Sequence, residues 1–213
     1  MGIPSYFSLI IRKYRNMVRN QSCCASVDHF LLDCNSIIYD AYHALRAEHA
    51  FTEDALCERT VATLAKYIHM VKPKQTVYIA FDGVAPYAKM EQQRTRRYKG
   101  AYFPDTRGEP EVGPAFHLSS ITPGTAFMEK LMGVVANAVV GKEAQWGVQR
   151  IVFSPSHDAG EGEHKLFQFL RDRGPRKEET TVVYGLDADL IMLSIYHVYL
   201  THNIFVCRET AQF

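Results

Sequence analysis

Residues 76–82, TVYIAFD, decide the fold class of this chain. The run is rich in β-branched and aromatic residues and ends in an acid, which indicates a buried strand. Further apolar runs have the same character, and the residues between them recur at helical spacing. These runs are HFLLD (29–33), RIVFS (150–154), TVVYG (181–185) and NIFVC (203–207). Strands that alternate with helices predict an α/β fold, in which a mostly parallel, twisted sheet carries helices on both faces.

Apolar spacing and capping residues predict the helices of this fold. Thr52 is a candidate N-cap, since the two acids that follow it suit the first turn of a helix. The predicted helices cover residues 7–14, 52–71, 124–138, 162–171 and 189–197, and residues 86–99 are considered as a helix as well. Residues 100–124 hold four of the nine prolines and four of the thirteen glycines, so we expect a long irregular segment there.

The bulk composition limits the class of protein. A chain of 213 residues is within the size of one domain, and we expect a single domain over residues 1–213. The charges nearly cancel, with 24 Lys and Arg against 23 Asp and Glu, so affinity for nucleic acid must come from local clusters. No run approaches the roughly 18 apolar residues of a membrane span, so no membrane association is expected. Five cysteines without metal-site spacing favour a reducing intracellular compartment, and we expect the cytoplasm rather than the nucleus.

Acidic residues follow the first four of these strands. The carboxyl ends of parallel strands meet at one rim of a sheet, where α/β proteins bind their ligands. The six acids are Asp33, Asp82, Glu161, Glu163, Asp187 and Asp189. Like charges about 4 Å apart repel by on the order of 4 kcal/mol at an effective dielectric of about 20, so a cation is expected among them. Carboxylates alone suit Mg²⁺ or Mn²⁺, and two such ions can activate water and stabilise a leaving oxygen at a phosphodiester.

The motif GEGEHK, residues 160–165, is the densest part of this acidic pattern. Residues two apart do not face each other in a helix, so we expect Glu161 and Glu163 to share a non-helical geometry that the adjacent glycines permit. We expect His164 to orient neighbouring groups or to cap the helix, because the proposed ions prefer oxygen. Taken singly, each acid has another interpretation as a helix cap, a turn residue or a first-turn acid.

A basic segment follows Asp82 directly. Residues 86–99 contain five Lys or Arg and one acid, Glu91. On a helix, a single face would carry four donors: Lys89, Gln93, Arg96 and Arg97. Forked guanidinium groups beside a lysine and an amide suit a terminal phosphate. The alternative is a charged face that is only solvated.

Several motifs together resemble the N-terminal conserved region of the Xrn-type 5′-3′ exoribonucleases, which are relatives of the flap endonucleases and share their PIN-like fold. They are MGIP, LLDCNSIIYDAYH, FDGVAPYAKMEQQRTRRYK, ITPGTAFM, GEGEHK and YGLDADLIML. The resemblance implies removal of nucleotides from RNA with a 5′-monophosphate, release of nucleoside 5′-monophosphates, and two Mg²⁺ ions, for which Mn²⁺ can substitute. It also implies that the six acids hold the metals, that the four donors of residues 86–99 form the 5′-phosphate pocket, and that other RNA-decay proteins are candidate partners.

The sequence departs from the family pattern at three places. Tyr39 stands where relatives usually carry a histidine that stacks against the terminal nucleotide, and its ring can still stack. The stretch after the basic segment is shorter and less charged, and the chain ends before a further acidic ligand and the second conserved region. We therefore expect a fragment of a larger enzyme or a shortened homologue. A flap-type endonuclease or DNA exonuclease, and a module that binds 5′-phosphorylated RNA without cutting, are the alternative functions.

Overall fold

The computed structural model describes residues 6–19, 26–102 and 116–208. Its centre is a five-stranded sheet with the order β3-β2-β1-β4-β5, and every neighbouring pair is parallel. The strands are β1 (His29–Asp33), β2 (Thr76–Ala80), β3 (Arg150–Ser154), β4 (Thr180–Tyr184) and β5 (Asn203–Cys207). The predicted α/β class with a parallel sheet is confirmed.

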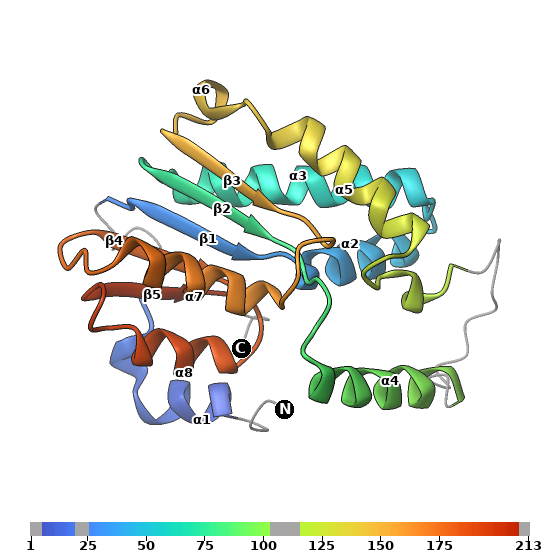
Figure 1. Cartoon of the computed structure of the whole chain (residues 1–213), viewed down its shortest axis with the longest axis horizontal. Helices are drawn as coiled ribbons and strands as arrows, with labels where there is room; N and C mark the ends of the chain where they lie inside the picture. Colours follow the sequence, from blue (N-terminus) through green and yellow to red (C-terminus); the bar gives the residue numbers. More distant parts are fainter. Residues whose placement is uncertain (1–5, 20–25, 103–115, 209–213) are drawn as a thin grey trace.

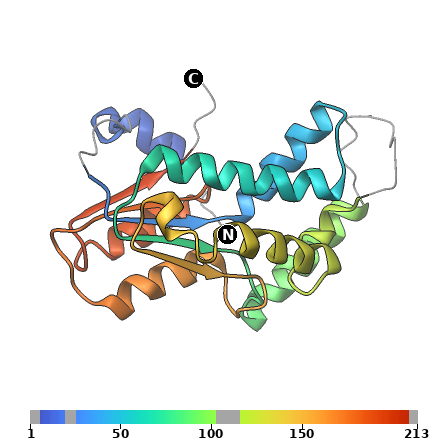
Figure 2. The same ribbon diagram turned by 90° about the horizontal axis from the view of Figure 1, so that it is seen from above.

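Helices cover both faces of the sheet, as predicted (Figure 1). On one side lie α2 (Asn35–Ala47), α3 (Glu53–Val71) and α5 (Ala126–Val139), and on the other lie α7 (Gly162–Arg173), α8 (Asp189–Tyr196) and α1 (Tyr6–Lys13). The short α6 (Glu143–Trp146) precedes β3. Seen from above, α3 lies roughly along the direction of the strands, whereas α4 (Tyr87–Tyr102) and α2 lie beyond their carboxyl ends (Figure 2). The loops and helix starts at those ends therefore form one surface.

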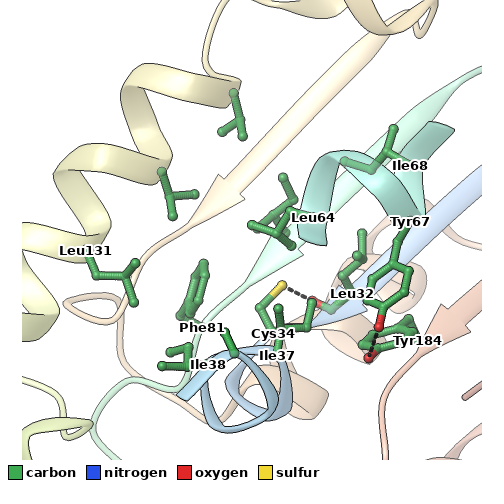
Figure 3. Close-up of a cluster of buried hydrophobic side chains, with 14 of the residues drawn as sticks. Leu32, Cys34, Ile37, Ile38, Leu64, Tyr67, Ile68, Phe81, Leu131 and Tyr184 are labelled. Atoms are coloured by element: carbon green, nitrogen blue, oxygen red, sulfur yellow. Dashed lines mark hydrogen bonds between the residues drawn. The ribbon is translucent and has the colours of Figure 1, made fainter. Parts of the chain in front are cut away.

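Two apolar clusters, one on each face, hold these layers together. The larger lies under α2, α3 and α5 and contains fully buried Phe30, Leu64 and Phe81. Figure 3 shows part of this cluster, in which Tyr184 of β4 donates a hydrogen bond from its hydroxyl to that of Tyr67 at 3.3 Å. The smaller cluster packs α7 and α8 against the other face. Burial of both faces explains why β1, β2 and β4 carry apolar residues in succession instead of alternating.

Most predicted elements are found, with shifts at their ends. The strands predicted at 29–33, 150–154 and 203–207 have the predicted bounds, β4 is shifted by one residue, and β2 ends at Ala80. Thr52 caps α3 as predicted, because its Oγ1 accepts a hydrogen bond from the Ala55 amide at 3.0 Å. None of the described helices is long and apolar enough to cross a membrane.

Three features differ from the prediction. No helix was predicted at residues 35–47, although Ile37, Ile38, Ala41 and Leu45 of α2 are buried at helical spacing. The segment predicted as irregular from residue 100 is helical through Tyr102, and a turn of 3₁₀ helix covers Leu118–Ser120. The rest of that prediction, residues 103–115, lies outside the described residues. The single-domain prediction stays a prediction.

Candidate active site

The order of the strands brings the predicted acids together. From β1 the chain moves outward to β2 and β3, and then returns to β4 and β5 on the other side of β1. Such a reversal leaves a crevice at the carboxyl ends of the strands, the usual binding position in this fold class. Helix α7 makes the return crossing and packs on β1 and β2. Its first turn therefore lies over the ends of those two strands.

Gly162, at the start of α7, sits directly against two of the acids. Its amide donates a hydrogen bond to Oδ1 of Asp82 at 2.7 Å. A Cβ atom at Gly162 would overlap Oδ1 of Asp33 and would lie 3.4 Å from Oδ1 of Asp82. Only glycine lets the backbone of α7 approach both carboxyls this closely. The second glycine of GEGEHK therefore serves close packing, whereas the backbone freedom predicted for both glycines is used at Gly160, whose φ is 101°.

Asn35 holds Asp82 from the other side. The Nδ2 atom of Asn35 donates to Oδ2 of Asp82 at 2.8 Å, and its Oδ1 atom accepts from the Asp82 amide at 3.0 Å. Asp82 thus has a hydrogen bond on each carboxyl oxygen, one from Asn35 and one from Gly162. Such bonds fix the orientation of a carboxylate before any ligand binds. Sequence reasoning missed Asn35, because its partner lies 47 residues away.

Glu161 and Glu163 are buried, with 5% and 8% of their surfaces exposed. Glu161 precedes α7 in an extended conformation, whereas Glu163 belongs to the first turn of the helix. The expectation that both residues adopt a non-helical geometry is therefore wrong for Glu163. The two carboxylates still converge, because one stands just before the helix and the other just inside it. An acid in the first turn also interacts favourably with the helix dipole.

Burial and neighbouring carboxylates raise the pKa of Asp33, Asp82 and Glu163. Burial raises the pKa of Asp33 well above its ordinary value, and the charges of Asp82, Glu163 and Asp187 raise it further. Burial also raises the pKa of Asp82 and of Glu163, in each case against the opposing effect of nearby donors and cations. These shifts show that five of the six predicted acids lie within electrostatic reach of each other.

Asp33 carries the feature that points most directly to a cation. Its Oδ1 atom is buried and has no hydrogen-bond partner among the described residues. A buried, unpaired carboxylate oxygen beside other carboxylates is costly. A hard divalent ion supplies the missing partner, since such ions bind oxygen ligands. The residues present therefore fit a divalent metal.

His164 joins the acidic cluster at its exposed edge. Its Nε2 atom lies 3.7 Å from Oε2 of Glu161 and 3.9 Å from Oε1 of Glu163. Ligand atoms of these three residues lie within 4.8 Å of one another, a spacing at which they could hold one ion. Sequence reasoning assigned His164 no ligand role, and its signal was its position inside GEGEHK.

Asp187 and Asp189 lie beyond the end of β4 and differ in their surroundings. Asp187 is exposed, and its charge acts on Asp33 and Glu163. Asp189 is the first residue of α8, and no interaction links it to the other five acids in the described part of the chain. The assignment of all six as metal ligands stays a prediction.

The basic segment is helical, as considered from the sequence. It forms α4, which projects beyond the carboxyl ends of the strands (Figure 1). Lys89 and Gln93 are half-buried, whereas Met90, Glu91 and Arg94 are exposed, so one face of α4 turns toward the protein. The side chains of Arg96 and Arg97 lie outside the described part of the structure.

Lys89 connects α4 to the acidic cluster. Its Nζ atom donates to Oε2 of Glu161 at 2.7 Å and lies 3.9 Å from Oε1 of Glu163. Burial alone would lower the pKa of Lys89, but the hydrogen bond and charge of Glu161 outweigh it and raise the pKa. Lys89 thus stays charged beside the carboxylates.

Tyr39, the candidate stacking residue, lies on α2. It is half-buried and packs partly against the larger apolar cluster. Its role in stacking stays a prediction.

Known proteins similar to this chain carry the name 5′-3′ exoribonuclease. Residues 1–210 match the family described as the XRN 5′-3′ exonuclease N-terminus. The 5′-3′ exoribonuclease 1 of Saccharomyces cerevisiae is 34% identical over 92% of this chain and 14% of the yeast protein. The human 5′-3′ exoribonuclease 1 is 32% identical over 92% of this chain and 12% of its own length. The 5′-3′ exoribonuclease 2 of Candida albicans is 30% identical over 92% and 24%. This chain thus spans less than a quarter of the length of these relatives.

Proposed function

Because this chain belongs to the family of the XRN 5′-3′ exonuclease N-terminus, we propose that it forms the catalytic region of a metal-dependent 5′-3′ exoribonuclease. The substrate is RNA with a 5′-monophosphate, and the product is a nucleoside 5′-monophosphate. The relatives carry the name 5′-3′ exoribonuclease, which supports the reaction type and the direction of degradation.

The acidic cluster would hold the metal. Asp33, Asp82, Glu161 and Glu163 offer carboxylate oxygens, and Asp187 lies at their edge. An all-oxygen set favours Mg²⁺, with Mn²⁺ as a substitute, and the charge of the cluster suits two ions. When bound, such ions activate water and stabilise the leaving oxygen of a phosphodiester. Asn35 and the Gly162 amide hold Asp82 in place for this task.

Helix α4 would bind the 5′ end of the RNA. Lys89 and Gln93 share its less exposed face, and the helical spacing puts Arg96 and Arg97 on the same stripe. A terminal monophosphate offers several acceptor oxygens and up to two charges, which such donors match. A 5′-hydroxyl end lacks these acceptors, so this binding would select the substrate before cleavage.

The contact between Lys89 and Glu161 is the observation that carries the proposal. One residue belongs to the proposed phosphate pocket and the other to the proposed metal site, yet their charged atoms are 2.7 Å apart. An RNA whose 5′-phosphate is held at Lys89 would place its nearest phosphodiester bonds beside the carboxylates. Cleavage there releases a short 5′ product, as an exonuclease does, and not an internal fragment.

The test is decay of RNA labelled at its 3′ end, with the 5′ end as monophosphate, hydroxyl or triphosphate. We expect decay of the monophosphate substrate in Mg²⁺ and none with a chelator, while the hydroxyl and triphosphate substrates resist. Asp33→Asn should stop decay and retain monophosphate-dependent binding. The matched control is Asp172→Asn, which changes an exposed acid on α7 and should leave decay unchanged.

The same experiment separates the alternative functions. Equal decay of all three ends would contradict the phosphate-pocket assignment. Cleavage of branched or linear DNA in preference to RNA would favour a flap-type endonuclease or DNA exonuclease. Monophosphate-dependent binding without cleavage, at any Mg²⁺ or Mn²⁺ concentration, would show a binding module.

A further inference from the structure

Lys165 is a buried cation that neither the metal site nor the phosphate pocket uses. It lies in the first turns of α7, with 9% of its surface exposed. Its Nζ atom donates to the backbone oxygen of Phe81 at 2.8 Å and to that of Pro155 at 2.9 Å. Burying a charged ammonium is costly, so a role that offsets this cost is expected.

The two acceptors of Lys165 belong to the two segments that carry the acids. Phe81 directly precedes Asp82 after β2, and Pro155 opens the segment that leads from β3 to Glu161. These segments also bond to each other, since Gly83 donates to Gly160 at 2.8 Å and Gly160 donates to Val84 at 3.0 Å. The side chain of Lys165 therefore joins the same two segments that these backbone hydrogen bonds join.

Among the described residues, no carboxylate forms an ion pair with Lys165. Both of its hydrogen-bond acceptors are neutral carbonyl oxygens. Its electrostatic partners are Asp158, Asp82 and Asp33, whose charges raise its pKa against the larger lowering effect of burial. In return, Lys165 favours the ionised form of Asp82. Lys89, by contrast, is paired directly with Glu161.

We propose that Lys165 is a positioning residue of the acidic site. Its ammonium ties the segment that carries Asp82 to the segment that leads to Glu161, and it offsets the repulsion between the carboxylates while no metal is bound. A flexible backbone would otherwise let like charges move apart. The ammonium of Lys165 thereby keeps the site in a geometry that can bind the metal.

The test is a double-mutant cycle on thermal stability in a chelator, with Lys165→Met and Asp82→Asn. Methionine keeps the length of the side chain and removes the charge. An open groove of about 610 Å³ is lined by Lys165, His164 and Gly160. We expect Lys165→Met to lower the Tm, and this loss to fall to about half or less in the Asp82→Asn background.

Asp172→Asn is the matched control background, since this exposed acid of α7 is not among the electrostatic partners of Lys165. The full loss should persist there. An equal loss in the Asp82→Asn and Asp172→Asn backgrounds would overturn the proposal and leave Lys165 as a backbone support only. If Lys165→Met folds only together with Asp82→Asn, the proposal is supported. If it folds in no background, the same comparison is made with Lys165→Gln, which keeps a donor.

A second measurement adds Mn²⁺ to the same proteins. The metal should raise the Tm of Lys165→Met more than that of the unchanged protein, because it takes over the missing positive charge. An equal rise in both would count against the proposal. This inference rests on the proposed metal site, but the chelator cycle needs neither metal nor RNA. Absence of any Mn²⁺ effect would contradict the proposed function, and the chelator cycle would then decide the role of Lys165.

Discussion

Lys89 of α4 donates a hydrogen bond to Glu161 of the acidic cluster, with 2.7 Å between Nζ and Oε2. The lysine is 36% exposed in its side chain and the glutamate only 7%, so the pair stands where the cluster opens toward α4. Each partner has a second proposed task, the lysine toward a phosphate and the glutamate toward a metal. Under the proposed function, a metal at Glu161 would weaken the hold on Lys89 and leave the lysine available to the 5′ end. The pair would then link recognition to catalysis.

Replacing this lysine should reduce the selectivity for a 5′-monophosphate over a 5′-hydroxyl end. Lys89→Met removes one charge-assisted hydrogen bond to the 5′-phosphate, which corresponds to a loss of about tenfold to hundredfold in selectivity. The measurement is the ratio of decay rates for 5′-monophosphate and 5′-hydroxyl RNA. Arg94→Met is the control, because Arg94 is exposed and pairs with Glu91 of its own helix. An unchanged ratio in Lys89→Met would remove the lysine from the phosphate pocket.

Gly162→Ala should damage the site with a single methyl group. The added Cβ would overlap Oδ1 of Asp33 and crowd Asp82, so both carboxyls must move. We expect Mn²⁺ binding, measured by calorimetry, to weaken at least about tenfold, because catalytic and metal sites tolerate little displacement. Gly133→Ala is the control, since nothing lies within 4 Å of that position in α5. This control should bind metal normally and gain about 0.4–1 kcal/mol of stability. Normal Mn²⁺ affinity in Gly162→Ala would argue against this geometry.

The raised pKa of Asp33 predicts a pH dependence of stability without metal. The folded protein holds this proton at a pH where the unfolded chain, with an ordinary carboxyl pKa of about 4, has lost it. The contribution of Asp33 to stability therefore falls as the pH rises from about 4 through the raised pKa. We expect the Tm in chelator to drop more steeply with rising pH in the unchanged protein than in Asp33→Asn.

Comparing the unchanged protein with Asp33→Asn separates the effect of Asp33 on stability from that of histidines, which titrate in a neighbouring pH range. Burial lowers the pKa of His29 and of His197, so their effect on stability runs the other way but is the same in both proteins. Saturating Mn²⁺ should remove most of the difference in slope, because the metal replaces the proton. Parallel pH profiles in chelator would show that Asp33 ionises as it does in the unfolded chain.

Asn35→Ala should separate orientation from charge. The change removes both hydrogen bonds to Asp82 and leaves every carboxylate in place. We expect the free energy of unfolding, measured by denaturant titration, to fall by about 1–3 kcal/mol. We also expect slower RNA decay. Asn16→Ala serves as the control, because Asn16 is exposed in the 3₁₀ helix after α1. Decay at the normal rate in Asn35→Ala would mean that Asp82 needs no support.

The sequence predicts the sheet well because its strands are short, apolar and separated by helical periodicity. RIVFS matches β3 residue for residue, and Thr52, whose side chain caps the helix, indicates the start of α3. Helix α2 was missed, because it follows β1 after a single residue and its N-cap, Cys34, makes no side-chain capping bond. The acids at the strand ends were identified from their positions at or just after the ends of the predicted strands.

What the sequence does not reveal are contacts between distant segments. Lys165 bonds to Phe81 across 84 residues, and Asn35 bonds to Asp82 across 47. The fold brings each of these residues to its partner, and the spacing between them in the sequence follows no periodic pattern. Glu163 was assigned a non-helical geometry because two acids two residues apart diverge inside a helix. The helix begins between them, at Gly162, which is also the start predicted for the helix over residues 162–171.

The size of the first product tests the central claim most directly. RNA with a labelled 5′-phosphate is mixed with excess protein and Mg²⁺, and the reaction is stopped within one turnover. If α4 holds the 5′ end beside the carboxylates, the first labelled product is a nucleoside 5′-monophosphate. A labelled oligonucleotide as the first product would contradict the account, because the 5′-phosphate would then be bound far from the acidic cluster.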